Sequence, residues 1–339
     1  MACHLYVSIS GEDKILIFVI NPQTGKLSAQ SEVKVTDRPA NMAIHPGEQF
    51  MYVGRRREIS SYRRNLETGD LSLIGTVSLE FKPDLIFTDQ KGRFLLSTYW
   101  AEGKVAIHKI GADGIVAAAP VQWLVTARGV HFVHTDPSNR FVFIPCTTSF
   151  DNANAIFQFK FDEVAGHLTP NTPDRVPSEK GAGPRHLCFH PNLDTVYCSN
   201  EEGNSVTAYR FNSSTGTLSA FQTISTLPES YKGKSICSDI QISPSGKFLY
   251  VSNRIHNSIA CFSIDTYNGS LKSIGQVPAE TNVRSISLDA DGNFLYTVGL
   301  DSGRLASYRV NPDTGELKLH ETYTVGKEPW WLLITKPSR

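Results

Sequence analysis

Apolar and polar residues alternate over short stretches of the chain, and turn-forming residues separate one stretch from the next. Residues 185–224 show the arrangement in full. Their β-branched and aromatic content, with a side-chain period of two, predicts strands rather than helices. We expect strands at 185–189, 195–199, 205–211 and 218–224, with a tight turn at 214–216 before the last strand. No segment of the chain predicts a substantial helix.

The same unit recurs along the whole chain. Successive copies start 44, 47, 54, 53 and 46 residues apart. Repeats of about 40–50 residues rich in short strands are typical of propeller blades. A glycine marks each turn before an outermost strand, where a hairpin needs the positive φ that glycine adopts without strain. The six intact copies are marked by Phe50-Met51-Tyr52, Phe94-Leu95-Leu96, Phe141-Val142-Phe143, Thr195-Val196-Tyr197, Phe248-Leu249-Tyr250 and Phe294-Leu295-Tyr296.

The seventh copy is divided between the two ends of the chain. Leu5-Tyr6-Val7 continues the strand pattern that the segment 330–334 begins. The sequence therefore predicts an all-β fold, a seven-bladed β-propeller with four antiparallel strands per blade. We expect a single domain, 1–339, because no blade can bury its faces alone. Its closing blade combines about 3–35 with 329–337, and this shared blade removes exposed sheet edges.

Composition and charge narrow the classes of function. The 339 residues include 33 Lys and Arg and 33 Asp and Glu, so no global field recruits nucleic acid or an anionic membrane. The first residues lack the basic and apolar regions of a signal peptide, and no apolar run approaches the about 18 residues of a membrane span. The six cysteines lack Cys-x-x-Cys spacing, and several lie in strand-like runs. We expect buried, reduced thiols and a cytoplasmic protein.

Strand direction sorts the loops between two faces of the disc. The starts of the innermost strands, the ends of the second strands and two long connections, 171–183 and 225–237, lie on one face. Long loops on one face tend to mark the binding side of a propeller. The innermost strands begin at Ala40, Asp84, His131, Arg185, Ser238, Arg284 and Trp330. The second strands lead to Ser10, Arg56, Trp100, Thr147, Glu201, Arg254 and Leu300.

These two rings are unusually polar for positions beside buried strands, where an unpaired charge is costly. A water-filled channel mouth would explain them without any chemistry. An anion site also explains why His131, Arg185, Glu201 and Arg254 converge in neighbouring blades. Guanidinium forks match carboxylate or phosphate oxygens, and a histidine with an ordinary pKa of about 6.5 can act as a base or an acid. These four residues are the predicted catalytic set.

Asp84, His186, Arg284 and Trp330 are the further residues predicted to bind the substrate. Because His186 follows Arg185 and alternates away from the channel, we expect it to be a packed structural histidine. His45 and His190 are expected to be turn residues on the far face, and 55–57 is expected to be a solvated basic loop. No spacing of histidines or aspartates predicts zinc or calcium, so we expect no metal and no cofactor.

Several motifs resemble those of the bacterial propeller-type 6-phosphogluconolactonases, over essentially the whole chain. They are Gly181-Ala182-Gly183-Pro184-Arg185-His186, Phe189-His190-Pro191-Asn192, Asn200-Glu201, Gly129-Val130-His131, Asp136-Pro137-Ser138-Asn139, Asn253-Arg254 and Val325-Gly326-Lys327-Glu328-Pro329-Trp330-Trp331. The same superfamily includes the fungal 3-carboxy-cis,cis-muconate lactonizing enzymes. A His, two Arg and a Glu form the proposed catalytic set there, and by motif these fall on His131, Arg185, Arg254 and Glu201.

The resemblance implies hydrolysis of a sugar δ-lactone without a metal, with 6-phosphoglucono-δ-lactone as the leading substrate. His131 would deprotonate water, Arg185 would stabilise the oxyanion, Arg254 would hold the substrate and Glu201 would orient an arginine or the water. Three alternatives stay open: hydrolysis of a non-phosphorylated or sulfonated sugar lactone, cycloisomerisation of a muconate, and a binding scaffold without chemistry. The expected partner is a small anionic lactone, with neither nucleic acid nor membrane, and a monomer is compatible with the sequence.

Overall fold

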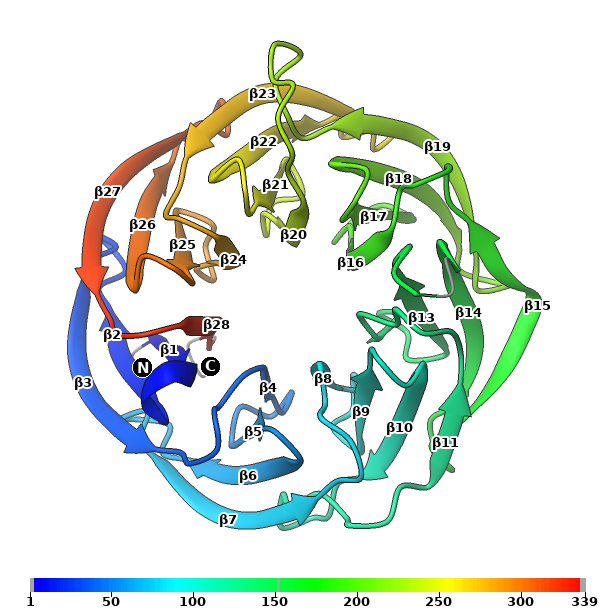
Figure 1. Ribbon diagram of the computed structural model, residues 1–339, viewed down its shortest axis with the longest axis vertical. Coiled ribbons are helices and arrows are strands. Elements are labelled where there is room, and N and C mark those ends of the chain that lie inside the picture. The colour runs from blue at the N-terminus through cyan, green and yellow to red at the C-terminus, as the bar shows by residue number, and fades with distance from the viewer. Residues whose placement is uncertain (1–2, 151–152, 336–339) are drawn as a thin grey trace.

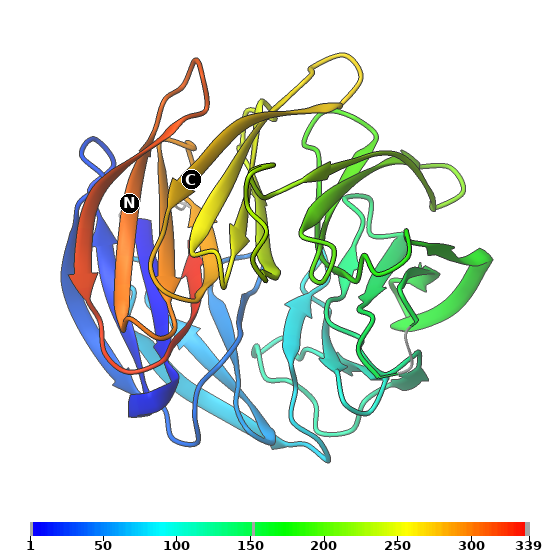
Figure 2. The same ribbon diagram turned by 45° about the horizontal axis from the view of Figure 1, so that its top comes forward.

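The computed structural model describes residues 3–150 and 153–335 and confirms the predicted propeller. Seven four-stranded antiparallel sheets surround a central channel (Figure 1). Figure 2 shows the hairpin turns projecting from both faces of the ring. In the described residues, the only helix is a short 3-10 turn, η1 (Ser10–Glu12).

Six blades are continuous in sequence, and each places its first strand at the channel and its last at the rim (Figure 1). Blade one contains β4 (Met42–Ile44), β5 (Phe50–Gly54), β6 (Glu58–Arg64) and β7 (Leu71–Ser78). Blade two contains β8 (Leu85–Thr88), β9 (Phe94–Tyr99), β10 (Lys104–Lys109) and β11 (Gln122–Val125). Blade three contains β12 (His134–Thr135), β13 (Phe141–Cys146), β14 (Ala155–Asp162) and β15 (His167–Pro177).

The next three blades continue around the ring in the same order. Blade four contains β16 (Pro184–Phe189), β17 (Thr195–Asn200), β18 (Ser205–Asn212) and β19 (Thr217–Ser225). Blade five contains β20 (Cys237–Ile242), β21 (Phe248–Asn253), β22 (Ser258–Ile264) and β23 (Leu271–Pro278). Blade six contains β24 (Val283–Leu288), β25 (Phe294–Gly299), β26 (Arg304–Val310) and β27 (Leu317–Thr324).

Both ends of the chain build the closing blade. Its strand order is β28 (Pro329–Ile334), β1 (Cys3–Ile9), β2 (Lys14–Ile20) and β3 (Leu27–Lys34). β28 pairs antiparallel with β1, with Leu5 opposite Ile334 and Val7 opposite Leu332. Of the predicted C-terminal piece, positions 336 and 337 lie outside the described residues.

The recurring glycine turns hold neighbouring blades together. In several blades the phenylalanine that begins the second strand packs on the turn glycine of the next blade, as Phe141 packs on Gly216. A Cβ on Gly216 would lie only 2.0 Å from Cδ1 of Phe141. Tyr197, two residues after the start of β17, donates a hydrogen bond to the carbonyl of Gly269 at 2.8 Å. The repeated aromatic motif and the glycine therefore form one contact between blades.

Glutamines close three of the gaps between blades at the rim. Gln222 accepts a hydrogen bond from the N–H of Leu271 at 2.7 Å and donates one to its carbonyl at 2.8 Å. Gln122 makes the same pair of bonds to β15, and Gln158 accepts a bond from β19. These side chains replace the ladder bonds that the outer strands of adjacent sheets cannot make to each other.

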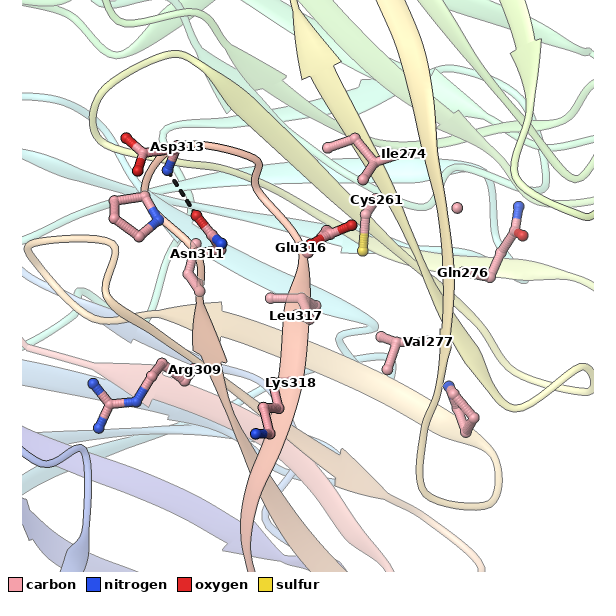
Figure 3. A pocket seen from close by; sticks show the side chains of 14 residues that line it. Cys261, Ile274, Gln276, Val277, Arg309, Asn311, Asp313, Glu316, Leu317 and Lys318 are labelled. Atoms are coloured by element: carbon pink, nitrogen blue, oxygen red, sulfur yellow. Dashed lines mark hydrogen bonds between the residues drawn. The ribbon is translucent and has the colours of Figure 1, made fainter.

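Between blades five and six the glutamine is absent. In blade four Gln222 lies opposite Ala208, and at the equivalent position of blade five Gly275 lies opposite Cys261. Gly275 therefore occupies in β23 the position that Gln222 occupies in β19. A groove of about 700 Å³ opens there, between β23 and β27 (Figure 3). Its lining includes residues of the glycine turn of blade six. The glycine turns lie on the face opposite the predicted site, so the groove lies toward that opposite face.

One predicted loop is wrong. The segment from Asn171 was expected to be a long connection over the binding face, but β15 extends to Pro177 and only 178–183 connects it to β16. β15 contains Pro170, Pro173 and Pro177, and it is the outermost strand of its sheet. Edge strands tolerate proline because one side of the strand needs no ladder hydrogen bonds. The second predicted connection, 225–237, is present, and residues 226–236 link β19 to β20.

β-Bulges interrupt the innermost strands where they meet the channel mouth. Pairing shifts between Pro184 and His186, between Cys237 and Ile240, and between Val283 and Ser285. A bulge adds an unpaired residue and changes the direction of its side chain. The added residues include Arg185 and Arg284, which belong to the predicted site.

Candidate active site

A cavity of about 240 Å³ opens at the channel mouth, on the face where the two polar rings were predicted. We call it the mouth cavity. It is lined by Asn41, Lys82, Asp84, Trp100, His131, Glu201, Arg254, Arg284 and Trp330. The structure therefore brings together six of the predicted residues, at 84, 131, 201, 254, 284 and 330. The other two, Arg185 and His186, do not line this cavity.

Glu201 joins the two predicted catalytic arginines. Its carboxylate lies 3.2 Å from Nε of Arg185 through Oε2 and pairs with Nη2 of Arg254 through Oε1. Arg185 is enclosed, with 2% of its surface exposed, and burial lowers its pKa to about 10 despite Glu201. A buried guanidinium needs such partners, because an unpaired buried charge is strongly unfavourable.

The expectation that His186 faces away from the channel is wrong. The bulge at Arg185 breaks the alternation, and His186 lines a second cavity, of about 320 Å³, inside the central channel. Nη1 of Arg185 lies 3.0 Å from Nε2 of His186, and Nδ1 of His186 lies 3.1 Å from Asp239. Because a guanidinium only donates, Nε2 of His186 is the acceptor and Nδ1 carries the proton. His186 is therefore held as a neutral link between Arg185 and Asp239.

Asp239 anchors this chain of bonds. It also accepts hydrogen bonds from the N–H groups of Ile240 and Ile286 and from the hydroxyl of Ser285. Burial raises the pKa of Asp239 to about 6. The sequence did not predict Asp239. Strict alternation placed Ser238 in the polar ring, and no periodic pattern marks the bulge that turns Asp239 toward the channel.

His131 is the channel histidine that faces the mouth cavity. It lines the mouth cavity, and its Nδ1 is buried with no hydrogen-bond partner among the described residues. Burial, and after it the positive charge of Arg185, lowers the pKa of His131 well below its ordinary value. His131 is therefore neutral at pH 7, the form that accepts a proton.

Arg284 is the guanidinium without a carboxylate partner in this part of the described structure. Its Cζ lies 3.9 Å from the ring centre of Trp330. Burial, followed by repulsion from Arg185 and Arg254, lowers its pKa to about 9. A cation stacked on an indole and lacking a counter-charge is suited to an incoming anion.

Asp84 and Lys82 also line the mouth cavity. Oδ2 of Asp84 accepts a hydrogen bond from the N–H of Trp100 at 2.7 Å, and Nζ of Lys82 lies 4.0 Å from Oδ1. Burial raises the pKa of Asp84. The cavity lining thus carries three cationic side chains and two carboxylates, with Arg185 directly behind Glu201. Lys82 was not predicted, because it belongs to the connection before β8 rather than to either ring.

His45 and His190 are turn residues, as predicted. Nε2 of His45 lies 3.1 Å from the carbonyl of Gly92, and Nε2 of His190 lies 2.9 Å from that of Gly246. Within residues 3–150 and 153–335, no group of three His, Cys, Asp or Glu side chains is arranged to hold a metal ion. Over the same residues, no helix has the length and apolar character needed to cross a membrane.

Known proteins share this fold and this length. The family described as "Lactonase, 7-bladed beta-propeller" matches residues 4–334. The chain therefore belongs to the seven-bladed β-propeller lactonase family.

Individual relatives agree with this assignment. A 6-phosphogluconolactonase of Pectobacterium carotovorum is 32% identical over 332 residues, which cover 97% of this chain and 98% of the relative. The 6-phosphogluconolactonase of Pectobacterium atrosepticum is 33% identical with the same coverage. The periplasmic gluconolactonase of Pseudomonas aeruginosa has a TM-score of 0.90 at 24% identity, with 100% of both chains covered, and shows the shared fold.

Proposed function

We propose that this protein hydrolyses a sugar δ-lactone in the mouth cavity, and that 6-phosphoglucono-δ-lactone is its substrate. The observation that carries the proposal is a neutral histidine facing a cavity lined by cations. Family membership supports the reaction class, and the relatives named 6-phosphogluconolactonase support the substrate. The arrangement supplies a base for water and positive charge for an oxyanion, which ring opening requires.

In the proposed reaction, His131 takes a proton from a water molecule as the oxygen attacks the lactone carbonyl. Protonation of Nδ1 would leave the Nε2 lone pair for this step, because Nδ1 is the buried nitrogen. The tetrahedral intermediate collapses by breaking the ring C–O bond, and the leaving oxygen receives the proton back from His131. The product is an open-chain acid, and the histidine returns to its neutral form.

We assign stabilisation of the oxyanion to Arg284, and contact with the substrate to Arg254. The sequence had suggested Arg185 for the oxyanion. Arg185 is enclosed by Glu201 and His186, whereas Arg284 lines the cavity and is unpaired in the described structure. In this assignment Arg185 is a positioning residue, since it fixes Glu201, which in turn holds Arg254.

We also propose the cytoplasm as the compartment. All six cysteines are free, and burial raises the pKa of Cys146 to about 12, which makes its thiol unreactive. Unpaired cysteines are typical of a reducing compartment.

The reaction can be followed by coupling lactone opening to 6-phosphogluconate dehydrogenase and recording NADPH. We expect the protein to accelerate product formation well above the spontaneous rate with 6-phosphoglucono-δ-lactone. A rate equal to spontaneous hydrolysis, with correctly folded protein, would exclude this substrate. The same test with glucono-δ-lactone, followed by acid release, separates a general sugar lactonase from one that requires the phosphate.

A further inference from the structure

A third cavity adjoins the mouth cavity. It measures about 150 Å³ and is lined by Ser10, Arg38, Ala40, Arg56, Lys82 and Trp330. We call it the basic cavity, because three of its six lining residues are cationic and none is acidic. Lys82 and Trp330 line both cavities, so the two cavities are direct neighbours.

The backbone holds the basic side chains in place. Asp37 and Arg38 both adopt left-handed conformations, with φ of 67° and 57°. The N–H of Arg38 donates a hydrogen bond to Oδ1 of Asp13 at 2.8 Å, and the N–H of Arg56 donates one to the carbonyl of Asp37 at 3.3 Å. A non-glycine residue is uncommon in this conformation, and two in succession define a specific local shape.

Ser10 adds a hydroxyl group to the basic cavity. It is 4% exposed and lines the basic cavity, and its hydroxyl has no hydrogen-bond partner among the described residues. Its N–H is bonded to the carbonyl of Glu328 at 3.0 Å, so the residue is fixed by its backbone. The hydroxyl is available to donate a hydrogen bond to an oxyanion in this cavity.

Two cations of the basic cavity have only distant counter-charges, and the third forms a direct ion pair that is exposed to solvent. Nε of Arg56 lies 3.9 Å from Asp37, Nζ of Lys82 lies 4.0 Å from Asp84, and Arg38 pairs with the half-exposed Glu328. Such exposed ion pairs contribute little, so a dianion can replace them. This differs from Arg185 and Arg254, which share the enclosed carboxylate of Glu201.

A second basic segment, Tyr231-Lys232-Gly233-Lys234, bonds in part to its own loop. Nζ of Lys232 donates a hydrogen bond to the carbonyl of Glu229 at 2.8 Å, and Tyr231 donates one to the carbonyl of Lys234 at 2.9 Å. Neither lysine lines the mouth cavity or the basic cavity. This loop is therefore the weaker candidate for an anion.

We propose that the basic cavity binds the phosphoryl group of the substrate, through Ser10, Arg38, Arg56 and Lys82, while the lactone ring lies in the mouth cavity. The inference rests on the proposed lactonase function and names its specificity site. It also changes the interpretation of Arg56, which the sequence placed in a solvated loop. Guanidinium groups and a hydroxyl are the donors that a phosphate monoester accepts.

The test compares two lactones that differ only in the phosphate. For Arg56→Ala, we expect kcat/KM for 6-phosphoglucono-δ-lactone, divided by kcat/KM for glucono-δ-lactone, to fall about tenfold or more, the scale of one charge-assisted bond. The side chain of Arg56 is 68% exposed, so the substitution should not disturb folding. Arg57→Ala removes the same charge one residue away, outside both cavities, and should leave the ratio unchanged. An unchanged ratio in Arg56→Ala, or an equal fall in Arg57→Ala, would overturn the proposal.

A binding measurement separates this inference from the proposed reaction. Calorimetry with 6-phosphogluconate and with gluconate needs no turnover. We expect Arg56→Ala to weaken binding of 6-phosphogluconate about tenfold or more relative to gluconate. If the protein opened neither lactone but Arg56→Ala still showed this selective loss, the proposed reaction would be wrong and the phosphate site would be supported. Equal weakening of both acids, or none, would overturn the site even in an active lactonase.

Discussion

At the scale of single residues, three histidines lie in the wall of the channel and differ in what their ring nitrogens contact. Both nitrogens of His186 are engaged, and Nδ1 of His134 lies 2.6 Å from the carbonyl of Thr135. His131 makes no hydrogen bond through its side chain within the described structure, although its ring centre lies 5.2 Å from that of His186. Only His131 combines a free nitrogen with access to the mouth cavity, which is why we assign it the base.

Replacing His131 by glutamine tests this assignment. Glutamine keeps polarity and approximate size but cannot accept the proton, so turnover should fall by roughly a hundredfold or more. His167→Gln is the matched control, because His167 is exposed on β15 and lies outside both cavities. Steady-state kinetics with the coupled assay, and circular dichroism to check folding, give the readout. Near-normal turnover by folded His131→Gln protein would contradict the mechanism.

The pH profile follows from the lowered pKa of His131. A base works only when neutral, so activity is present above its pKa and is lost as pH falls through it. Because burial and Arg185 lower that pKa, the rate corrected for spontaneous hydrolysis should stay level down to about 6.5, the ordinary value, and fall only in more acid solution. A half-maximal rate at or above that pH would show that His131 is not the base or is not enclosed as described.

Arg284 links activity to stability. Arg284→Met should lower kcat/KM by roughly a hundredfold to a thousandfold if the guanidinium stabilises the oxyanion. The free energy of unfolding should stay equal or rise, since a buried charge repelled by Arg185 and Arg254 is removed while packing on Trp330 is kept. Kinetics and urea unfolding measure the two effects. A clear loss of stability would mean that Arg284 supports the fold, and unchanged kinetics would return the oxyanion role to Arg185.

The sequence could predict most of these residues because equivalent positions in a repeat lie on the same ring. It could not predict that Arg185 is enclosed, that His186 turns into the channel, or that Asp239 anchors it. Each error arises at a β-bulge, where one added residue reverses the inward and outward alternation. A bulge depends on tertiary contacts, so no periodic signal marks it in the chain.

At the scale of elements, the regular strands and the glycine turns could be predicted. The extent of an outermost strand and the contacts between outermost strands could be predicted less well. Alternation and turn chemistry located the strands, since both are local. β15 was missed beyond its first residues because prolines usually end strands, and an outermost strand relaxes that rule. The hydrogen bonds that Gln122, Gln158 and Gln222 make between blades could not be predicted either. A single glutamine in a strand does not show which backbone groups its side chain contacts.

The bridge at Gln222 allows a measurement of what holds two blades together. Gln222→Ala leaves the N–H and carbonyl of Leu271 without their partners and should lower the free energy of unfolding by about 1–2 kcal/mol. Lys272→Ala, an exposed change on the adjacent strand, should lie within about 0.5 kcal/mol of the wild type. Urea unfolding followed by tryptophan fluorescence measures both. Equal effects in the two variants would mean that water replaces the glutamine without cost.

At the scale of the whole molecule, the ring depends on a blade assembled from residues more than 290 positions apart. β28 pairs with β1 along its length, and the N–H of Thr335 donates a hydrogen bond to the carbonyl of His4 at 3.0 Å. The sequence predicted this closure because the first and last segments complete one repeat. Closure also builds the site, since Trp330 lies at the start of β28 and lines both cavities.

Deleting 329–339 should therefore remove both the closed ring and the site. Without β28, the edge of β1 is unpaired, and Leu5 and Val7 lose their neighbours Ile334 and Leu332. An open hydrophobic edge favours association between chains, so we expect oligomers in size-exclusion chromatography and no cooperative thermal transition. A synthetic peptide of the deleted sequence should pair with β1 as an added strand and restore part of the monomer and of the lactonase activity. A scrambled peptide of the same composition should restore neither. If the shortened chain stayed monomeric with an unchanged thermal midpoint, the shared blade would not be what closes the propeller.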